Sequence, residues 1–345
     1  MSEDYAFNIA VYAMTNVGMV RSGNEDNFLV LNLTTADTWT PDKIHEEPAA
    51  HLTTFSQSHF GSLLAVSDGM GGALAGEVAS HHAIECVRDR MLELQASPTY
   101  QKIAFHERLR LSIELANLYI HQMSQQRSEY AGMGATFTGA GLLGTTAYFG
   151  QVGDSRAYLI RGGRVQKVTR DQSLVEQLVE AGHITEEEAE RHTYKNVILQ
   201  ALGAAPSVNV VVDRVELRDL DIILLCSDGL TSNFKVKPEE MVRLIDQSHS
   251  LKEACESLIG LANQRGGEDN ITVLVAQVTG GKLQPPEPAV TDGSTLPLSA
   301  AAGLQDRWGA ETLPRDPDLP YEVDLDLVDD EEETIPPTER LSSDS

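Results

Sequence analysis

The 345-residue sequence has few cysteines, few aromatic residues, and half as many basic as acidic side chains. Its three cysteines, Cys86, Cys226 and Cys255, are too few and too widely spaced for a disulfide framework or a thiolate zinc site. The net charge of −26 excludes a nucleic acid or an anionic membrane held by bulk electrostatics. No apolar run approaches ~18 residues, and the N-terminus lacks the basic and apolar regions of a signal peptide. We therefore expect a soluble, cytoplasmic and monomeric protein.

Acidic residues and prolines gather at the C-terminal end. Residues 280–345 hold sixteen acidic and four basic residues, and nine of the fourteen prolines. A segment with so little apolar surface and so much charge of one sign does not repay the entropy of ordering. We expect a folded domain over 1–279 and an acidic, proline-rich, disordered tail over 280–345.

The folded part combines short strands with amphipathic helices. Apolar residues recur at helical spacing over 84–94, 109–123 and 251–261, so each helix has one stripe to pack against a sheet. Two helices follow several strands, and more strands follow them, an order that favours the α+β class. Gly162-Gly163 indicates a two-residue hairpin. Strands are predicted at 9–14, 28–33, 62–67, 145–152, 157–161, 164–168, 208–217, 221–226 and 271–278.

Residues 171–203 have a different character. Ser173 with Glu176, and Thr185 with Glu188, have the spacing of capping boxes, so each pair predicts the start of a short helix. Both helices are polar, which predicts a small subdomain on the surface.

One phrase occurs twice, as LLAVSDG at 63–69 and LLCSDG at 224–229. In both copies an apolar strand ends in an aspartate, Asp68 or Asp228, followed by Gly69 or Gly229. The strand would hold the carboxylate rigidly, and the glycine that follows tolerates backbone angles that other residues avoid. Asp-Gly is also common in ordinary turns, so neither copy alone distinguishes a functional carboxylate from a plain turn.

Three further acidic signals lie at strand edges, namely Glu25-Asp26, Asp154 and Asp269-Asn270. Carboxylates gathered at one point repel each other until protons or cations neutralise them. Oxygen ligands without a cluster of His or Cys favour hard ions such as Mg²⁺ or Mn²⁺. Two such ions activate a water and hold a phosphoryl group. The spacing alone does not establish that these segments meet.

In their order along the chain, five motifs resemble the metal-dependent PP2C-type (PPM) protein phosphatases, and most of all the bacterial branch: RSGNED (21–26), SDGMGG (67–72), GDSRAY (153–158), SDGL (227–230) and EDNIT (268–272). The resemblance covers about residues 7–278. It implies a four-layer α-β-β-α sandwich of two antiparallel sheets flanked by helices, with 171–203 as a small helical flap. It also implies hydrolysis of phosphoserine and phosphothreonine by direct attack of a metal-bridging water.

The resemblance further implies two tightly bound Mn²⁺ or Mg²⁺ ions. Asp68 matches the carboxylate that bridges them, and Asp154 with Asp228 matches the pair that holds a third, weaker ion in bacterial members. The full set of implied metal ligands is Glu25, Asp68, the carbonyl of Gly69, Asp154, Asp228 and Asp269.

Three other residues complete the implied site. Arg21 matches the arginine that binds the substrate phosphate, a contact that suits a bidentate guanidinium group. Asp26 and Asn270 match residues that lie behind the metal ligands.

Four positions depart from the family pattern. Met70 stands where eukaryotic members carry a histidine that is a candidate general acid, and Ala73 where bacterial relatives often carry one. In the flap, Gln172 and Thr193 replace a histidine and a proline. The metal ligands are retained, so the changes bear on rate and selectivity, and the proton donor to the leaving group stays unassigned.

The remaining candidates have simpler interpretations. None of the ten histidines has ligand-like spacing with another, and His81-His82 suits a solvated pair on a helix. Cys226 lies in an apolar run and is expected to be buried rather than nucleophilic. Arg156 is expected to be structural, and residues 34–60 form an extra stretch that the sequence does not place.

The tail repeats one phrase, in which Thr295, Thr312 and Thr334 each precede an apolar residue and a proline. A solubilising linker is one interpretation. The other is phosphorylation by a cognate Ser/Thr kinase, after which phosphothreonine docks a forkhead-associated domain or acts back on the enzyme. Expected partners are therefore phosphorylated proteins, that kinase and, through the tail, a forkhead-associated domain.

Three functions fit the sequence. A metal-dependent protein serine/threonine phosphatase is preferred because every implied ligand is retained. A catalytically silent docking module with the same fold is the alternative, and a phosphohydrolase acting on small phosphoesters is the third.

Overall fold

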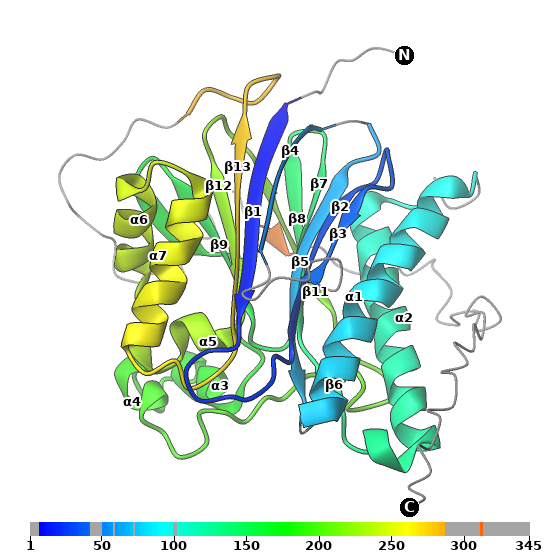
Figure 1. Ribbon diagram of the computed structural model, residues 1–345. Coiled ribbons are helices and arrows are strands. Elements are labelled where there is room, and N and C mark those ends of the chain that lie inside the picture. The colour runs from blue at the N-terminus through cyan, green and yellow to red at the C-terminus, as the bar shows by residue number, and fades with distance from the viewer. Residues whose placement is uncertain are drawn as a thin grey trace, which may run out of the picture. The chain divides into compact units, whose positions relative to one another are not determined.

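Two antiparallel β-sheets stack face to face at the centre of the molecule, and helices cover both outer faces (Figure 1). The computed structural model describes residues 7–41, 50–57, 59–71, 73–98, 102–286 and 311–312. Within these residues the layer order is helix, sheet, sheet, helix, which confirms the predicted four-layer α+β sandwich.

The first sheet has the strand order β10-β9-β12-β13-β1-β4. In that order the strands are Arg164–Lys167, Arg156–Arg161, Ile222–Cys226, Ile271–Thr279, Asn8–Asn16 and Ala50–Ser56. The second sheet has the order β14-β11-β8-β7-β5-β2-β3, with β6 paired to β5. Its strands are Glu311–Thr312, Val211–Glu216, Thr146–Val152, Phe137–Leu143, Ser62–Met70, Asp26–Asn32, Thr38–Trp39 and, for β6, Gly134–Ala135.

Helices α1 (Ala73–Ala96) and α2 (Phe105–Gln126) cover the second sheet, and α6 (Pro238–Gln247) and α7 (Leu251–Gln264) cover the first (Figure 1). The predicted stripes explain this placement, because Ile84 and Val87 on α1 and Leu109 and Ile113 on α2 are all buried against the sheet. Each such apolar side chain stabilises the fold by roughly 1.5–3 kcal/mol relative to leaving it in water.

A third apolar layer lies between the sheets and fixes their separation. Inward-facing residues of both sheets form it, among them Val11, Phe28, Leu64 and Leu225. Both faces of each sheet are therefore buried, which leaves strand ends and connecting loops to carry a site.

The predicted strands are present, with ends shifted by up to three residues, and the hairpin is confirmed. Gly162 and Gly163 have positive φ angles of 55° and 72°, as a two-residue hairpin turn requires. Sequence analysis assigned no strand to 137–143 and no helix to 238–247, yet β7 and α6 lie there. β7 has two glycines, which mask its strand character, although it is paired on both sides.

Part of the extra stretch 34–60 is now placed. β3 pairs with β2, and β4 pairs with β1 at the edge of the first sheet. The ring of His51 on β4 stacks on Trp39, with centroids 5.2 Å apart. None of the described residues of this stretch lines the cavity that Asp68 and Asp228 border.

Only a small part of the predicted tail lies within the described residues, namely 280–286 and 311–312. Glu311–Thr312 pairs antiparallel with β11, so that Thr312 lies opposite Asp213. Thr295 and Thr334 lie outside the described residues, and the tail boundary stays a prediction. None of the described helices combines the length and apolar character needed to span a bilayer.

Candidate active site

Loops and strand ends far apart in the sequence meet at one end of the sandwich, the lower end in Figure 1. They surround a cavity of about 440 Å³. The five motifs, whose convergence the spacing left open, therefore share one cavity. Its charged lining residues are Arg21, Glu25, Asp68, Asp154, Lys195, Asp228, Lys235, Glu268 and Asp269.

Asp68 reaches the cavity from the end of β5. Its backbone N–H donates to Thr136 Oγ1 at 2.9 Å, and its carbonyl accepts from the Thr136 N–H at 2.8 Å. The hydroxyls of Thr136 and Ser155 are 2.7 Å apart. These contacts fix the backbone of Asp68, so its carboxylate is held in one direction.

Asp228 and Asp154 line the same cavity as Asp68. Asp228 is the first residue of the short helix α5 (Asp228–Thr231), which follows β12, and its Oδ2 accepts from Ser232 Oγ at 3.1 Å. Asp154 lies between β8 and β9 and acts electrostatically on Asp68 and Asp228.

Asp26 lies behind the cavity and is buried. Its Oδ2 accepts two hydrogen bonds of 2.7 Å, from Ser227 Oγ and Thr272 Oγ1, whereas its Oδ1 is buried without a hydrogen-bond partner. Burial raises the pKa of Asp26 to about 7 against the opposing effect of these two bonds. Asp26 stands opposite Asp68 in the β2–β5 pair, so the orphaned oxygen belongs to the same acidic group.

The loops before β2 and β13 are joined by side chains. Asn270 Oδ1 accepts from the Glu25 N–H at 2.8 Å, and Asn270 Nδ2 donates to the carbonyls of Val17 and Gly23. Arg21 makes a two-point ion pair with Asp269, at 3.0 Å for both Nε–Oδ1 and Nη2–Oδ2. The structure therefore places the arginine predicted to bind phosphate directly on a predicted metal ligand.

Burial and mutual repulsion raise the pKa of the central carboxyls. Burial is the larger cause for Asp68, Asp154 and Asp228, and neighbouring aspartates add to it. The donors are oxygen atoms, and one buried carboxylate oxygen has no protein partner. This chemistry fits hard divalent cations, which would replace the missing positive charge.

The glycines after the two aspartates serve a different purpose from the predicted one. Neither Gly69 nor Gly229 has a positive φ angle. A Cβ on Gly69 would lie 2.0 Å from the Gly76 carbonyl oxygen, and one on Gly229 would lie 1.9 Å from the Asn270 carbonyl oxygen. Close backbone approach, rather than a tolerance of unusual backbone angles, therefore requires glycine at both positions.

Two lysines and an asparagine at the cavity were not found from the sequence. Lys235 is 3% exposed, and its Nζ lies 3.7 Å from Glu268. Lys195 donates to Asn233 Oδ1, and Asn196 lines the cavity beside it. None of them belongs to a motif that marks an acidic centre, so only the fold could bring them there.

The predicted flap contains both capped helices, α3 (Leu174–Glu180) and α4 (Glu186–Glu190). Thr185 and Glu188 form the reciprocal capping box, and Ser173 accepts from the Glu176 N–H. A second cavity of about 130 Å³ lies between these helices and the first sheet, and Asp154 and Asp228 border both cavities. The flap thus lies directly against the site.

Arg156 anchors the start of the flap, as a structural residue would. Its Nε and Nη2 donate to Asp171 Oδ2 at 2.8 and 2.5 Å. Burial acts to raise the pKa of Asp171, but Arg156 and Lys167 outweigh it, so the pKa is lowered. Cys226 is fully buried, and burial raises the pKa of its thiol to about 12, which agrees with the prediction that it is no nucleophile.

Comparison with known proteins agrees with this architecture. Residues 49–264 match the family model described as protein phosphatase 2C. The serine/threonine phosphatase stp of Listeria welshimeri is 38% identical over 215 residues, which cover 62% of this chain and 84% of that protein.

Solved structures agree as well. The Mycobacterium tuberculosis serine/threonine phosphatase PstP/Ppp superposes with a TM-score of 0.63 at 31% identity, covering 79% of this chain and 100% of that one. A structure of the catalytic domain of the serine/threonine protein phosphatase PstP in complex with two manganese ions has a TM-score of 0.62 at 30% identity, with 79% and 100% coverage.

The four-layer sandwich and the acidic cavity at its end define the class of fold and site that the five motifs predicted. The chain belongs to the protein phosphatase 2C family.

Proposed function

We propose that this protein is a metal-dependent serine/threonine phosphatase that removes phosphate from phosphoserine and phosphothreonine in proteins. The observation that carries the proposal is the convergence of Asp68, Asp154, Asp228 and Asp269 on one cavity with Arg21 at its rim. The relatives named as serine/threonine phosphatases support it, because they share the family and the fold.

Two Mn²⁺ or Mg²⁺ ions are the proposed cofactors, and the manganese-containing relative supports them. The proposed ligands are those implied by the motifs, with Asp68 between the two ions and Asp154 at a third, weaker position. When bound, the ions supply a bridging water of lowered pKa that attacks phosphorus, and positive charge for the phosphoryl oxygens. The chain contributes fixed carboxylates, because the backbone of Asp68 is held by Thr136.

Arg21 is the proposed phosphate ligand. Its side chain is 47% exposed, and its guanidinium group is oriented by both oxygens of Asp269. Asp269 therefore holds the arginine at the mouth of the cavity, where a phosphate oxygen can accept from its remaining N–H groups. Lys195 and Lys235 add positive charge to the same cavity, although its six carboxylates leave the lining net negative until cations bind.

The test is hydrolysis of a phosphothreonine peptide by the full chain with Mn²⁺, with Mg²⁺ and with EDTA. We expect turnover that requires the metal and is lost in Asp228→Ala. Asp246→Ala is the matched control, because Asp246 lies on α6 and does not line the cavity.

Two results would contradict the proposal. Absence of turnover with either metal, from protein shown by circular dichroism to be folded, would favour the silent docking module. Hydrolysis of small phosphoesters in preference to phosphopeptides would favour a metabolite phosphohydrolase.

The partners follow from the reaction. Phosphorylated proteins are the proposed substrates, and a cognate Ser/Thr kinase would supply them. Phosphorylation of the tail threonines, docking to a forkhead-associated domain and a cytoplasmic location remain predictions. Mass spectrometry of tail peptides after incubation with such a kinase would test the first, and unmodified threonines would count against it.

A further inference from the structure

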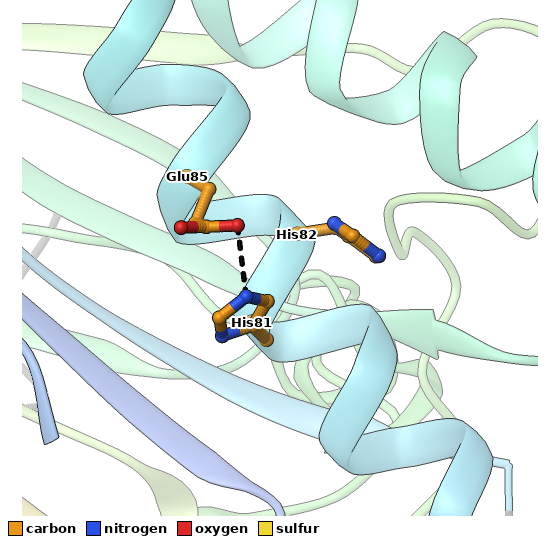
Figure 2. A group of neighbouring side chains, drawn as sticks. All are labelled: His81, His82 and Glu85. Carbon is orange, nitrogen blue, oxygen red and sulfur yellow. Dashed lines mark ion pairs between the residues drawn. The ribbon is translucent and has the colours of Figure 1, made fainter. Parts of the chain in front are cut away.

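A second group of metal-ligating side chains lies on α1, outside the acidic cavity. His81, His82 and Glu85 project from consecutive turns of this helix (Figure 2). Glu85 stands three residues after His82 and four after His81, and residues at these spacings are neighbours on a helix surface. The sequence interpretation of a simple solvated histidine pair overlooked Glu85.

The contacts show that the three side chains already lie close together. His81 Nε2 is 2.8 Å from Glu85 Oε2, the ion pair drawn in Figure 2. One possible ligand atom from each residue lies within 4.8 Å of the other two. Ligand atoms around a tetrahedral zinc ion with bonds of ~2.0 Å are about 3.3 Å apart, so small side-chain rotations suffice.

Neighbouring groups hold two of the side chains in position. The other oxygen of Glu85 accepts from Arg88 Nη1 at 3.3 Å. The ring of His82 meets the edge of Tyr119 on α2, with centroids 5.2 Å apart. His82 is partly buried at this contact. The preformed group therefore resembles a ligand set more than a solvated charge pair.

We propose that His81, His82 and Glu85 form a second metal site, selective for a divalent transition ion of the zinc class. Two imidazole nitrogens and one carboxylate suit Zn²⁺, and they differ from the all-oxygen set of the acidic cavity. Binding would displace the proton that His81 now shares with Glu85. Three protein ligands leave one position for water or for a partner's side chain.

The site lies on the helix that begins directly after the Asp68 strand. The first turn of α1 touches the acidic site, because a Cβ on Gly76 would lie 2.9 Å from the Glu25 carboxyl carbon. The His82–Tyr119 contact ties the other side of α1 to α2. A metal ion here would therefore stiffen a helix that supports the candidate active site.

Cu²⁺ is the probe that separates the two sites, because nitrogen ligands give superhyperfine and spin-echo signals that oxygen ligands do not. The full chain and its Asp68→Asn variant are loaded with one equivalent of Cu²⁺, and Zn²⁺ is then titrated in competition. We expect a signal from two imidazole nitrogens in both proteins. His81→Gln and Glu85→Gln should each lower the competing Zn²⁺ affinity at least about tenfold. His249→Gln is the matched control, because that histidine is exposed and lies near α7.

Loss of the two-nitrogen signal in both His81→Gln and His82→Gln, with unchanged circular dichroism, would establish the site. An unchanged signal in both variants, or its loss in His249→Gln alone, would overturn the proposal. His81 is partly exposed, so its variant keeps the test valid should His82→Gln fail to fold. The readout does not use catalysis, so failure here leaves the phosphatase proposal untouched.

Discussion

The two ends of strand β12 carry aspartates with opposite surroundings. Asp221, before the strand, is 1% exposed and pairs with Arg161, whose Nε and Nη2 donate to its two oxygens at 2.8 and 2.6 Å. Asp228, after the strand, lines one cavity with Asp68, Asp154 and Asp269. One end is neutralised by the protein itself, whereas the other concentrates negative charge.

The difference separates a structural carboxylate from a functional one. Burying a charge costs several kcal/mol, and a well-formed pair with further hydrogen bonds repays it. The backbone N–H of Arg218 supplies such a bond to Asp221, at 2.7 Å. At the other end Arg156 stands opposite Cys226 in the strand pair, two residues before Asp228, and its side chain bonds to Asp171. The acidic group is thus left to be neutralised by cations from solution.

The largest expected effect comes from removing carboxylates at the acidic end. Asp68→Ala and Asp228→Ala should each lower kcat/KM for a phosphopeptide by at least about a hundredfold, because losing one group that stabilises charge already costs 10²–10³. In EDTA neither variant should be less stable than the parent, since repulsion is relieved. Thermal melts check this, and a clear loss of stability in EDTA would mean that these aspartates are structural.

Breaking the Arg161–Asp221 pair at the other end of β12 should lower the stability of the fold and leave the activity unchanged. Arg161→Met leaves Asp221 buried without its cation, so the free energy of unfolding should fall by about 3–5 kcal/mol. Urea unfolding measures the change. The double variant Arg161→Met, Asp221→Leu should recover much of the loss, and kcat/KM per folded molecule should stay the same in both. A loss of turnover in folded protein would show that the two ends are coupled.

An intermediate effect is expected at Arg21, which is paired with Asp269 but exposed at the rim of the cavity. Arg21→Ala should lower kcat/KM by the equivalent of roughly 2–4 kcal/mol, mainly through a raised KM, if its phosphate contact is partly desolvated. Arg170→Ala, a change at an exposed arginine that does not line the cavity, is the control. Unchanged kinetics for Arg21→Ala would remove the phosphate assignment.

The smallest effect is expected at the ion pair between Glu240 on α6 and Arg265 at the end of α7. Arg265 lowers the pKa of Glu240 to about 2, and its nitrogens are 2.6 and 2.8 Å from the carboxylate. Such a depressed pKa stabilises the fold above pH ~4.5, and this stabilisation is lost as the pH falls from there towards 2. Glu240→Gln keeps the helix cap and should cost less than about 1 kcal/mol at pH 7. The difference between the two proteins should shrink at pH 3.5, and a constant difference would assign it to packing.

Local patterns predicted much of this molecule. The helical stripes of α1, α2 and α7 and the strands β5, β12 and β13 follow from spacing, because one buried face leaves a regular mark on the sequence. α6 was missed although Pro238 and Glu240 mark its start, and β7 was missed because its glycines hide the apolar run.

The five motifs predicted the residues of the candidate site, but they did not predict the contacts between those residues. The ion pair of Arg21 with Asp269, the orphaned oxygen of Asp26 and the lysines at the cavity depend on segments that are far apart in the chain. Spacing along the sequence carries no information on such pairs.

By itself, the sequence determined the periodicities, the repeated Asp-Gly phrase and the ligand types, because these are local properties of the chain. The tertiary structure decided which aspartate pairs with an arginine of the protein and which does not. Asp221 and Asp228 are only seven positions apart, at the two ends of one apolar strand. Their surroundings differ because the β9–β12 pair brings Arg161 to Asp221, whereas the two stacked sheets bring Asp68 into the cavity of Asp228. Charge compensation is a long-range property, and the pairing of strands and the stacking of the two sheets set it.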